Sequence, residues 1–373
     1  MIAAVIFYRA AAKGFPEEFV SAGRRAFTRD LVTSLQQAGL ANIFLLTGEE
    51  EFGSSMSGEG VQWIRPKDEG AFHFGRELQA VVREQGISGV LYFGGGSGGL
   101  LTRNQVSKLI SFAKVKRPAA LFNNFYSCDF AAISGAKELE NVELPSIDNQ
   151  LGFTLSAAGF PCFSVPRVAA SQFDIDTPTD LLVLAAAEQG GMATQAFCRQ
   201  QGLYHPHILE LVDRLVDREA HIYLIGRVNP ANWAWFEREV ACRTSGLIEG
   251  RGLRAYPNRS GTIIAKTIAQ AGIETFFRWL TGVADGALID TRPILARDGN
   301  LPPASDRFAS DLLLPEMISD PLWAEFTRVA RAAEIPVIIG GHSLVSGGLY
   351  LLTELCWRRK ELPRRLHPET IDW

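Results

Sequence analysis

The sequence lacks the long apolar run that a membrane span requires. Its longest apolar stretches, residues 2–8 and 181–187, end at Arg9 and Glu188. Both fall well short of the roughly 20 apolar residues needed to cross a bilayer. The amino-terminus also has no basic segment followed by a long apolar core and a cleavage site, so no secretory signal is expected. We therefore expect a cytoplasmic protein that does not interact with membranes.

Cysteine is scarce, and basic charge is not in excess. The five cysteines, at positions 128, 162, 198, 242 and 356, are dispersed and form no C-x-x-C pair. This spacing argues against a disulfide framework or a zinc site and favours reduced thiols. There are 37 Lys and Arg residues against 41 Asp and Glu, for a net charge of −4. Without a basic excess, nucleic acid is not expected to be the main partner.

The chain has the length and apolar content of a two-domain globular protein. It contains 373 residues, of which 47% are hydrophobic, and about 150 residues per domain is a usual prior. Short apolar runs alternate with helical patterns in the first half, which predicts an α/β domain with a mostly parallel sheet and helices on both faces. The strand candidates there are residues 2–8, 42–47, 61–65, 89–93, 119–122, 130–134 and 162–165.

A domain boundary is expected at residues 190–205, after an Ala-rich helix that ends near Gly190 and Gly191. This gives an α/β domain over residues 1–192 and a second domain over residues 205–373. Apolar runs at 220–225 and 335–339 predict strands in the second domain, and residues 263–280 read as a helix. The pattern there indicates an α/β or α-rich fold of no recognisable type.

The most specific motif is the sequence F-D-I-D-T-P-T-D-L at residues 173–181. Thr177 suits a helix N-cap, Pro178 the first helical position, and Asp180 the third, where a carboxylate interacts favourably with the helix dipole. A helix start does not account for Asp174. That residue is expected at a strand end before the helix, where α/β sheets commonly bind ligands.

This motif resembles the D-x-D-T-P-x-D-L element of nucleotidyltransferases with a GT-A-type fold, such as the molybdenum-cofactor guanylyl- and cytidylyltransferases and the phospholactate guanylyltransferases. The resemblance covers about residues 1–190. It implies that Asp174 is a catalytic Mg²⁺ ligand and that Asp176 is a neighbour of less certain role. It also implies a phosphate-binding loop after the first strand. That loop would be residues 9–14, with Lys13 as the catalytic phosphate-binding lysine and Arg9 and Gly14 beside it, although an ordinary solvated lysine remains the alternative.

The glycine-rich segment at residues 94–99 departs from the family pattern. The family places a metal-binding Asp after this strand, but the chain has Gly94, Gly95 and Gly96 there, followed by an L-L-T helix entry. Asp129 is the best replacement metal ligand, and Asp148 is another candidate. The glycines could bind phosphate through backbone N–H groups, or the segment could be only a tight loop.

Asn123 and Asn124 follow the next expected strand and could contact a base or hydroxyl of the substrate. A turn is the alternative, since Asn favours turns. In the second half, residues 341–345 resemble a nucleophile elbow, but Val345 replaces the glycine which that turn requires. A loop over residues 340–348 that contacts phosphate or substrate is the preferred interpretation there. Asp290 and Arg292 could pair charges in a pocket or form ordinary surface ion pairs.

The sequence thus predicts a Mg²⁺-dependent nucleotidyltransferase that uses a nucleoside triphosphate and a small anionic, phosphorylated acceptor. A non-catalytic nucleotide- or sugar-binding protein on a degenerate transferase scaffold is the first alternative, motivated by the missing carboxylate. A glycosyltransferase that uses a nucleotide-sugar is the second, motivated by the D-x-D spelling at residues 174–176. The motifs do not specify the base, the acceptor, or the oligomeric state.

Overall fold

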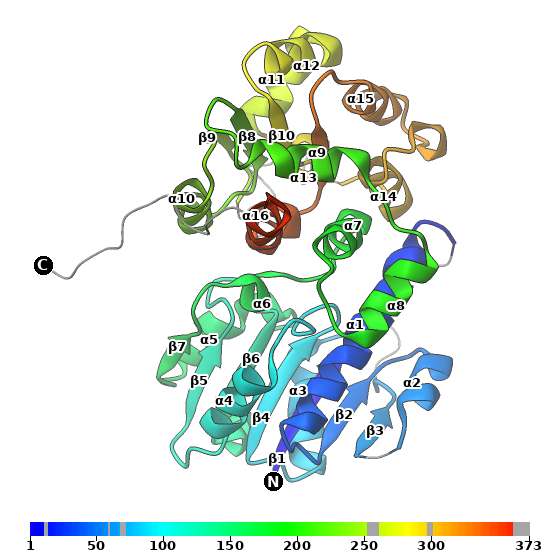
Figure 1. The fold of residues 1–373 in the computed structure, drawn as a ribbon. Helices are drawn as coiled ribbons and strands as arrows, with labels where there is room; N and C mark the ends of the chain where they lie inside the picture. Colours follow the sequence, from blue (N-terminus) through cyan, green and yellow to red (C-terminus); the bar gives the residue numbers. More distant parts are fainter. Residues whose placement is uncertain (11–13, 59, 68–71, 252–260, 297–300, 361–373) are drawn as a thin grey trace, which may run out of the picture. The chain divides into compact units, whose positions relative to one another are not determined.

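The computed structural model describes residues 1–10, 14–58, 60–67, 72–251, 261–296 and 301–360 (Figure 1). The chain divides into two compact units, each with its own sheet. The first unit comprises the described residues within 1–11, 21–174 and 190–194. The second comprises those within 12–20, 175–189 and 195–373.

The first unit is built on a seven-stranded sheet with the order β3-β2-β1-β4-β6-β5-β7. β6 is antiparallel to both of its neighbours, and all other pairs are parallel. The strands are β1 (Ile2–Phe7), β2 (Ile43–Leu46), β3 (Val61–Ile64), β4 (Gly89–Gly94), β5 (Ala119–Phe122), β6 (Phe130–Ser134) and β7 (Cys162–Ser164). The helices are α2 (Glu50–Met56), α3 (Phe74–Glu84), α4 (Arg103–Ala113), α5 (Leu151–Ala157) and α6 (Ala169–Gln172), together with α1 (Glu17–Gln37), of which residues 21–37 belong to this unit.

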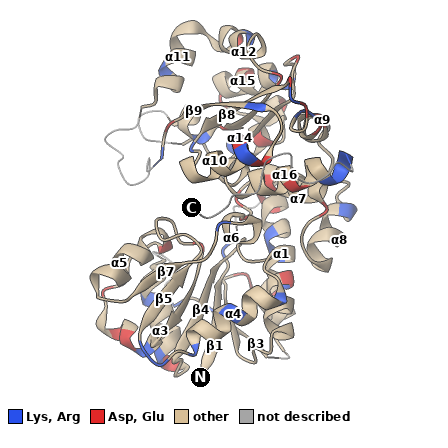
Figure 2. Ribbon diagram, turned by 60° about the vertical axis from the view of Figure 1, so that its left-hand side comes forward, with Lys and Arg blue, Asp and Glu red and all other residues tan. Residues whose placement is uncertain are grey.

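Helices cover both faces of this sheet because alternate strand residues are apolar on both sides. Val5 and Phe7 of β1 face one core with α3 and α5, whereas Ala4 and Ile6 face the other with α1, α2 and α4. None of the seven strands contains a Lys, Arg, Asp or Glu, and their ribbons are accordingly tan in Figure 2. Any charged side chain at the edges of this sheet therefore comes from the segments that precede or follow the strands.

The second unit contains a four-stranded parallel sheet with the order β11-β10-β8-β9. Its strands are β8 (His221–Gly226), β9 (Arg243–Ile248), β10 (Gly286–Asp290) and β11 (Val337–Gly340). Its helices include α7 (Pro178–Ala187), α9 (Pro206–Arg214), α10 (Pro230–Glu239), α11 (Ile263–Ala271), α12 (Ile273–Thr281), α13 (Arg292–Leu295), α14 (Ala304–Asp311), α15 (Pro321–Arg331) and α16 (Gly347–Lys360), while α8 (Met192–Gln200) runs from one unit into the other.

The predicted α/β class with helices on both sheet faces is confirmed, and the carboxy-terminal region is a further α/β unit. One division of the chain, after Thr194, lies within the boundary expected at residues 190–205, and two others lie after Asp174 and Gln189. α7 belongs to the second unit, where the Thr179 hydroxyl donates to the carbonyl oxygens of Asp311 (3.2 Å) and Ile339 (2.7 Å). The expected helix over residues 263–280 is two helices, α11 and α12, because Gly272 adopts a φ of 86° between them.

No helix in the described part of the chain is both long and apolar enough to span a bilayer.

Candidate functional site

The strand order of the seven-stranded sheet reverses between β1 and β4. The chain runs from β1 outward through β2 and β3 on one side, and β4 then pairs with β1 on the other. In open α/β sheets, ligands bind outside the carboxyl ends of the strands at such a switch point. Tyr8 and Arg9 follow β1 there, and Gly95 and Gly96 follow β4. The switch point therefore marks the candidate site of the first unit.

The loop after β4 packs its backbone against the end of β1. A Cβ atom on Gly95 would lie 2.9 Å from the carbonyl oxygen of Phe7 and 3.2 Å from the Cα of Tyr8, so no side chain fits. Gly96 has a φ of 105°, a conformation that residues with a side chain rarely adopt. This loop can therefore offer a ligand backbone groups but no side chain at these two positions.

Asp174 lies beside the same loop, because Ser97 and Asp174 form an isolated antiparallel bridge. The Ser97 hydroxyl donates to the carbonyl oxygens of Gly94 (2.8 Å) and Asp129 (3.0 Å). The end of β4, the residue before β6 and Asp174 are thus joined at one edge of the sheet. The two carboxylates that the sequence nominated as metal ligands, Asp129 and Asp174, both belong to this edge.

The predicted phosphate-binding loop is placed only in part. Arg9 is exposed at the carboxyl end of β1, where its guanidinium carbon lies 5.0 Å from the centroid of the Phe72 ring. Lys13 lies outside the described residues. Gly14 belongs to the second unit and has a φ of 105°. Of the three loop residues predicted to hold phosphate, only Arg9 is therefore placed at the switch point.

Asn123 cannot have the substrate-binding role predicted for it. Its Oδ1 accepts from the backbone N–H groups of Asp129 (2.9 Å) and Phe130 (3.1 Å), and its Nδ2 donates to Asp129 Oδ2 (2.8 Å) and the Ser171 carbonyl (3.1 Å). A buried amide with two donor and two acceptor bonds has no capacity left for a ligand. Asn123 instead fixes the position of Asp129.

Asn124 forms a turn, the alternative that its residue type favours. Its Oδ1 accepts from the backbone N–H of Tyr126 at 3.2 Å, and its side chain is half-buried. This bond spans two residues, which is the pattern by which Asn stabilises turns. The contact predicted between Asn124 and a base remains a prediction.

A buried phenol and thiol lie beneath the glycine loop, next to two carboxylates. The Tyr92 hydroxyl donates to Asp148 Oδ2 at 2.5 Å. Burial, and then the negative charge of Asp148, hold the pKa of Tyr92 well above its usual value. Burial likewise raises the pKa of the Cys128 thiol, with Asp129 and Asp148 adding to the effect. Tyr92 and Cys128 are therefore neutral near pH 7, and the negative charge here belongs to the aspartates.

Asp148 lies close to the position where the family pattern has a carboxylate. A Cβ atom on Gly94 would lie 3.7 Å from Asp148 Oδ2 and 3.3 Å from the Tyr92 hydroxyl. An acidic side chain at Gly94 would thus point into space that Asp148 and Tyr92 already occupy. From the sequence, Asp148 could be named as a candidate metal ligand only by its residue type. It lies 54 residues after Gly94, and no local pattern links the two positions.

The acidic residues fit a metal that is held mainly by its substrate. Among the residues that the structure describes, no group of three His, Cys, Asp or Glu side chains is arranged to hold a metal ion. Mg²⁺ in nucleotide enzymes usually takes only one or two carboxylates, and water and phosphate oxygens complete its coordination. Asp174 and Asp129 are compatible with that mode, whereas a metal centre made by protein ligands alone is not supported.

The helix start predicted in the D-x-D-T-P-x-D-L element is confirmed. α7 begins at Pro178 with Thr177 as its N-cap. Asp180 Oδ2 accepts from the Thr177 backbone N–H (2.7 Å), the Thr177 hydroxyl (2.9 Å) and the Asp176 backbone N–H (2.9 Å). Because this helix belongs to the second unit, the element spans the division of the chain immediately after Asp174.

Comparisons with known proteins found similar chains among solved structures. No protein-family model matches the chain, and no curated protein matches it. A nucleotidyl transferase from Methanothermobacter is 17% identical over 54% of this chain and 99% of its own, with a TM-score of 0.40. A cytidylyltransferase from Leptospira borgpetersenii is 15% identical over 54% of this chain and 94% of its own (TM-score 0.38).

A synthetase for CMP-2-keto-3-deoxy-manno-octonic acid, solved in complex with CTP, is 14% identical over 44% of this chain and 89% of its own, with a TM-score of 0.30. The similarity to these solved nucleotidyltransferases concerns the fold and lies in the amino-terminal region of the chain.

Proposed function

We propose that the first unit transfers a nucleotidyl group from a nucleoside triphosphate to a small anionic, phosphorylated acceptor. The observation that carries this proposal is the Ser97–Asp174 bridge. It brings the leading Asp of the D-x-D-T-P-x-D-L element to the β1/β4 switch point, beside a loop made of glycine backbone and next to the strand that Arg9 follows. Each of these features is suited to a phosphate-bearing ligand.

Each component has a distinct role in the proposed reaction. The backbone of Gly94–Gly96 and the Arg9 guanidinium bind the triphosphate, and Lys13 offsets its negative charge. Asp174, with Asp129, holds Mg²⁺, which would neutralise charge on the phosphates and on the departing pyrophosphate. The acceptor oxygen attacks the α-phosphorus in line with the bond to pyrophosphate. One P–O bond forms, one breaks, and pyrophosphate leaves.

Positioning, more than acid–base chemistry, would accelerate this reaction. Tyr92 and Cys128 are held neutral near pH 7 by burial and by the negative charge of neighbouring aspartates, which raise both pKa values. Holding the acceptor oxygen in line with the α-phosphorus can by itself supply several orders of magnitude in rate. The expected pH dependence of turnover is accordingly shallow between pH 6 and 8.

Non-catalytic nucleotide binding is the second candidate function. It is favoured by one observation, the glycines at positions 94–96 in place of the carboxylate in the family pattern. On this alternative the chain binds a nucleotide through Arg9 and the glycine loop but does not release pyrophosphate.

The experiment that separates the two candidates measures binding and turnover on the same sample. Thermal unfolding is followed with each of the four NTPs, with and without Mg²⁺, and pyrophosphate release is followed with a pool of phosphorylated acceptors. A ligand present at 100 times its Kd adds about 2.7 kcal/mol of stability. Stabilisation by an NTP with pyrophosphate release supports the enzyme, and stabilisation alone supports the binding protein. No stabilisation by any NTP contradicts both.

A further inference from the structure

The four-stranded sheet of the second unit has a switch point of its own. From β8, the chain forms β9 on one side and then returns to form β10 on the other, with β11 outside it. The order therefore reverses between β8 and β10, and their carboxyl ends are the expected place for a ligand. Arg227 follows β8 directly, and Asp290 is the last residue of β10.

Arg227 and Asp290 form a two-pronged ion pair across this switch point. Arg227 Nε donates to Asp290 Oδ2 (2.5 Å), and its Nη2 donates to Oδ1 (3.0 Å). The Asp290 carboxylate is fully buried and also accepts from the backbone N–H groups of Arg227 (3.3 Å) and Arg292 (3.2 Å). Burial alone would raise the pKa of Asp290, but Arg227 outweighs it and lowers that pKa, so Asp290 stays ionised.

The close approach of the two strand ends requires glycine before Arg227. Gly226 has a φ of 110°, and a Cβ atom there would lie 2.7 Å from both the Cβ and the carbonyl oxygen of Asp290. The backbone of β8 therefore lies directly against the end of β10, and Arg227 begins at a fixed distance from its partner.

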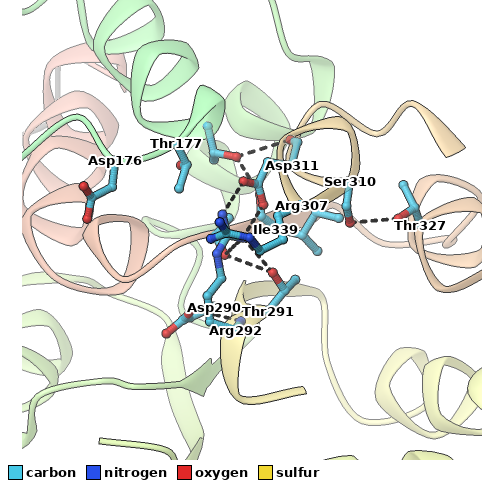
Figure 3. A network of polar contacts seen from close by, with 12 residues as sticks. Asp176, Thr177, Asp290, Thr291, Arg292, Arg307, Ser310, Asp311, Thr327 and Ile339 are labelled. Carbon is cyan, nitrogen blue, oxygen red and sulfur yellow. Dashed lines mark hydrogen bonds and ion pairs between the residues drawn. The ribbon is translucent and has the colours of Figure 1, made fainter. Parts of the chain in front are cut away.

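A second ion pair joins Arg292, at the start of α13 just after β10, to Asp311, at the end of α14 (Figure 3). Arg292 donates from Nη1 and Nη2 to the two carboxylate oxygens of Asp311 (2.6 and 2.7 Å), and from Nη1 to the Gly340 carbonyl (3.0 Å) and the Thr291 hydroxyl (2.8 Å). Both side chains are buried. Asp290 and Arg292 thus both form ion pairs, as the sequence allowed. Asp290 pairs with Arg227 and Arg292 with Asp311, and the Asp290 and Arg292 side chains are buried.

Two groups at this edge keep unused hydrogen-bonding capacity. In the described part of the chain, Arg227 Nη1 makes no hydrogen bond, and 22% of the Arg227 side chain is exposed. His342 follows the end of β11, and its Nδ1 is shielded from water and has no hydrogen-bond partner among the described residues. Burial, and then the positive charge of Arg227, lower the pKa of His342 to about 4. The imidazole is therefore neutral near pH 7.

We propose that the carboxyl edge of the four-stranded sheet is a second ligand site, where Arg227 Nη1 and the His342 imidazole bind an oxyanion, the phosphate or carboxylate group of a small molecule.

An oxyanion accounts for the unused capacity of both residues. Asp290 holds the guanidinium by Nε and Nη2, which fixes its plane and directs the Nη1 donors away from the pair. A buried polar atom without a partner costs free energy, so a small movement of the His342 ring that admits a ligand atom to Nδ1 would remove that cost. The Asp290 and Asp311 carboxylates are occupied by arginine donors. Of the Arg227 guanidinium, Nε and Nη2 bind Asp290, so its Nη1 is available to a ligand. His342 lies within residues 340–348, the loop for which a contact with phosphate or substrate is expected.

The test places the probe inside the second unit. The full-length protein is labelled at histidine, and its ring signals are followed by NMR near neutral pH during separate titrations with inorganic phosphate and with acetate. Sodium chloride keeps the ionic strength constant. The signal absent from the His342→Leu spectrum identifies His342. We expect a saturable shift of that signal, with phosphate if the ligand carries phosphate and with acetate if it carries a carboxylate.

Two substitutions with matched controls decide the role of Arg227. Arg227→Lys keeps a cation for Asp290 but withdraws the fork of donors, and we expect the affinity for the anion to fall at least about tenfold. Arg243→Lys makes the same change at the amino end of β9 and should leave the affinity unchanged. His221, at the amino end of β8, should show no saturable shift.

The proposal is overturned if neither anion produces a saturable shift of the His342 signal, or if Arg227→Lys binds as tightly as the wild-type protein. The wild-type titration alone is decisive should Arg227→Lys fail to fold. Because the probe is in the second unit, failure here is distinguishable from failure of nucleotide binding in the first, which Asp174→Asn tests.

Discussion

Each unit has a sheet edge at a reversal of strand order, but the two edges differ in the residues that follow the strands. At the β1/β4 switch point, the chain presents glycine backbone, with Gly95 against Phe7, and places its carboxylates in the surrounding loops. At the β8/β10 switch point, the ends of the strands carry ionised side chains paired with one another, with Asp290 fully buried. Both edges lie at a reversal of strand order, so topology alone does not determine what each can bind.

The difference suggests two sizes of ligand. Where Gly94–Gly96 carry no side chains, backbone N–H groups can approach the oxygens of a polyanion closely. An edge filled by paired charges leaves only the donors that the pairs do not use, here Arg227 Nη1 and His342 Nδ1. The first unit therefore suits a triphosphate, and the second suits a single anionic group.

Removing a carboxylate from the second edge should have the largest effect on stability. Asp311→Asn leaves Arg292 buried without its ionised partner, which typically costs about 3–5 kcal/mol. Urea unfolding followed by tryptophan fluorescence reports mainly on this unit, because Trp63 is the one described tryptophan in the first unit, whereas five described tryptophans, residues 233, 235, 279, 323 and 357, belong to the second. Glu274→Gln, which removes an exposed partner of Arg328, is the control and should change stability by less than about 1 kcal/mol. Equal effects of the two changes would mean that the buried pair does not stabilise the unit.

Adding one carbon at either switch point should cost somewhat less. Gly226→Ala combines a left-handed backbone with a Cβ only 2.7 Å from Asp290, and we expect a loss of about 2–4 kcal/mol. Gly202→Ala is the matched control, because its φ is 58° but nothing lies within 4 Å of its Cβ, and it should cost about 1 kcal/mol.

Gly95→Ala tests the same close packing in the first unit, where hydrogen exchange of β1 and β4 is the measurement. We expect a loss of about 1–3 kcal/mol from the contact with the Phe7 carbonyl. If the hydrogen exchange of β1 and β4 is unchanged, the loop after β4 can move away from Phe7. Close backbone packing would then not distinguish this edge from the β8/β10 edge.

The side-chain amide of Asn123 should matter for stability and not for ligand specificity. Asn123→Ala removes four hydrogen bonds around Asp129 and should destabilise the first unit by roughly 1–3 kcal/mol, measured by hydrogen exchange of β5 and β6. Asn124→Ala removes one turn bond and should cost less than about 1 kcal/mol. A change in the preferred base with Asn123→Ala, without loss of stability, would restore the substrate role that we have withdrawn.

Asp180 predicts a modest dependence of stability on pH. Burial raises its pKa to about 8, against a usual value near 4. Between these values the unfolded chain has lost the proton and the native protein has kept it, so this carboxyl stabilises less as pH rises. Relative to Asp180→Asn, the wild-type protein should lose about 1 kcal/mol between pH 6.5 and 7.5. A parallel pH dependence in the two proteins would show that Asp180 is ionised in the native state.

His342 predicts the opposite trend at lower pH. Its pKa of about 4 lies below the usual 6.5, so the unfolded chain binds a proton that the native protein does not. Stability should therefore fall as pH decreases from about 6.5 to 4, and His342→Leu should reduce this dependence. The comparison of pH profiles is made with the same fluorescence-detected unfolding as above.

Local chemistry explains how much of the fold the sequence could predict. Seven strand candidates in the first half correspond to β1–β7, because each is a short apolar run bounded by polar or turn residues. The start of α7 was predictable since Thr177, Pro178 and Asp180 act within one helical turn. The assignment of α7 to the second unit was not, because α7 joins that unit through Thr179, whose partners lie 132 and 160 residues away.

The site was predictable in composition but not in roles. Residue type and position nominated Asp129, Asp174 and the three glycines, and the structure places them at one edge. The sequence could not show that the Asn123 side chain uses all its hydrogen bonds on Asp129, Phe130 and Ser171, because Ser171 lies 48 residues away. Arg227 was visible only as the residue after a strand. Its pairing with Asp290 depends on strands that are 63 residues apart in the sequence.

Calorimetric titration of Asp174→Asn with an NTP and Mg²⁺ tests the proposed nucleotide site most directly. The NTP is the one that stabilises the wild-type protein best, and Asp176→Asn is the companion two residues away. If Asp174 holds Mg²⁺, Asp174→Asn should weaken Mg²⁺-dependent binding at least about tenfold while the unfolding temperature stays nearly unchanged, and Asp176→Asn should bind like wild type. Binding by Asp174→Asn that equals wild type in the presence of Mg²⁺ would contradict the assignment of this edge as the nucleotidyl-transfer site.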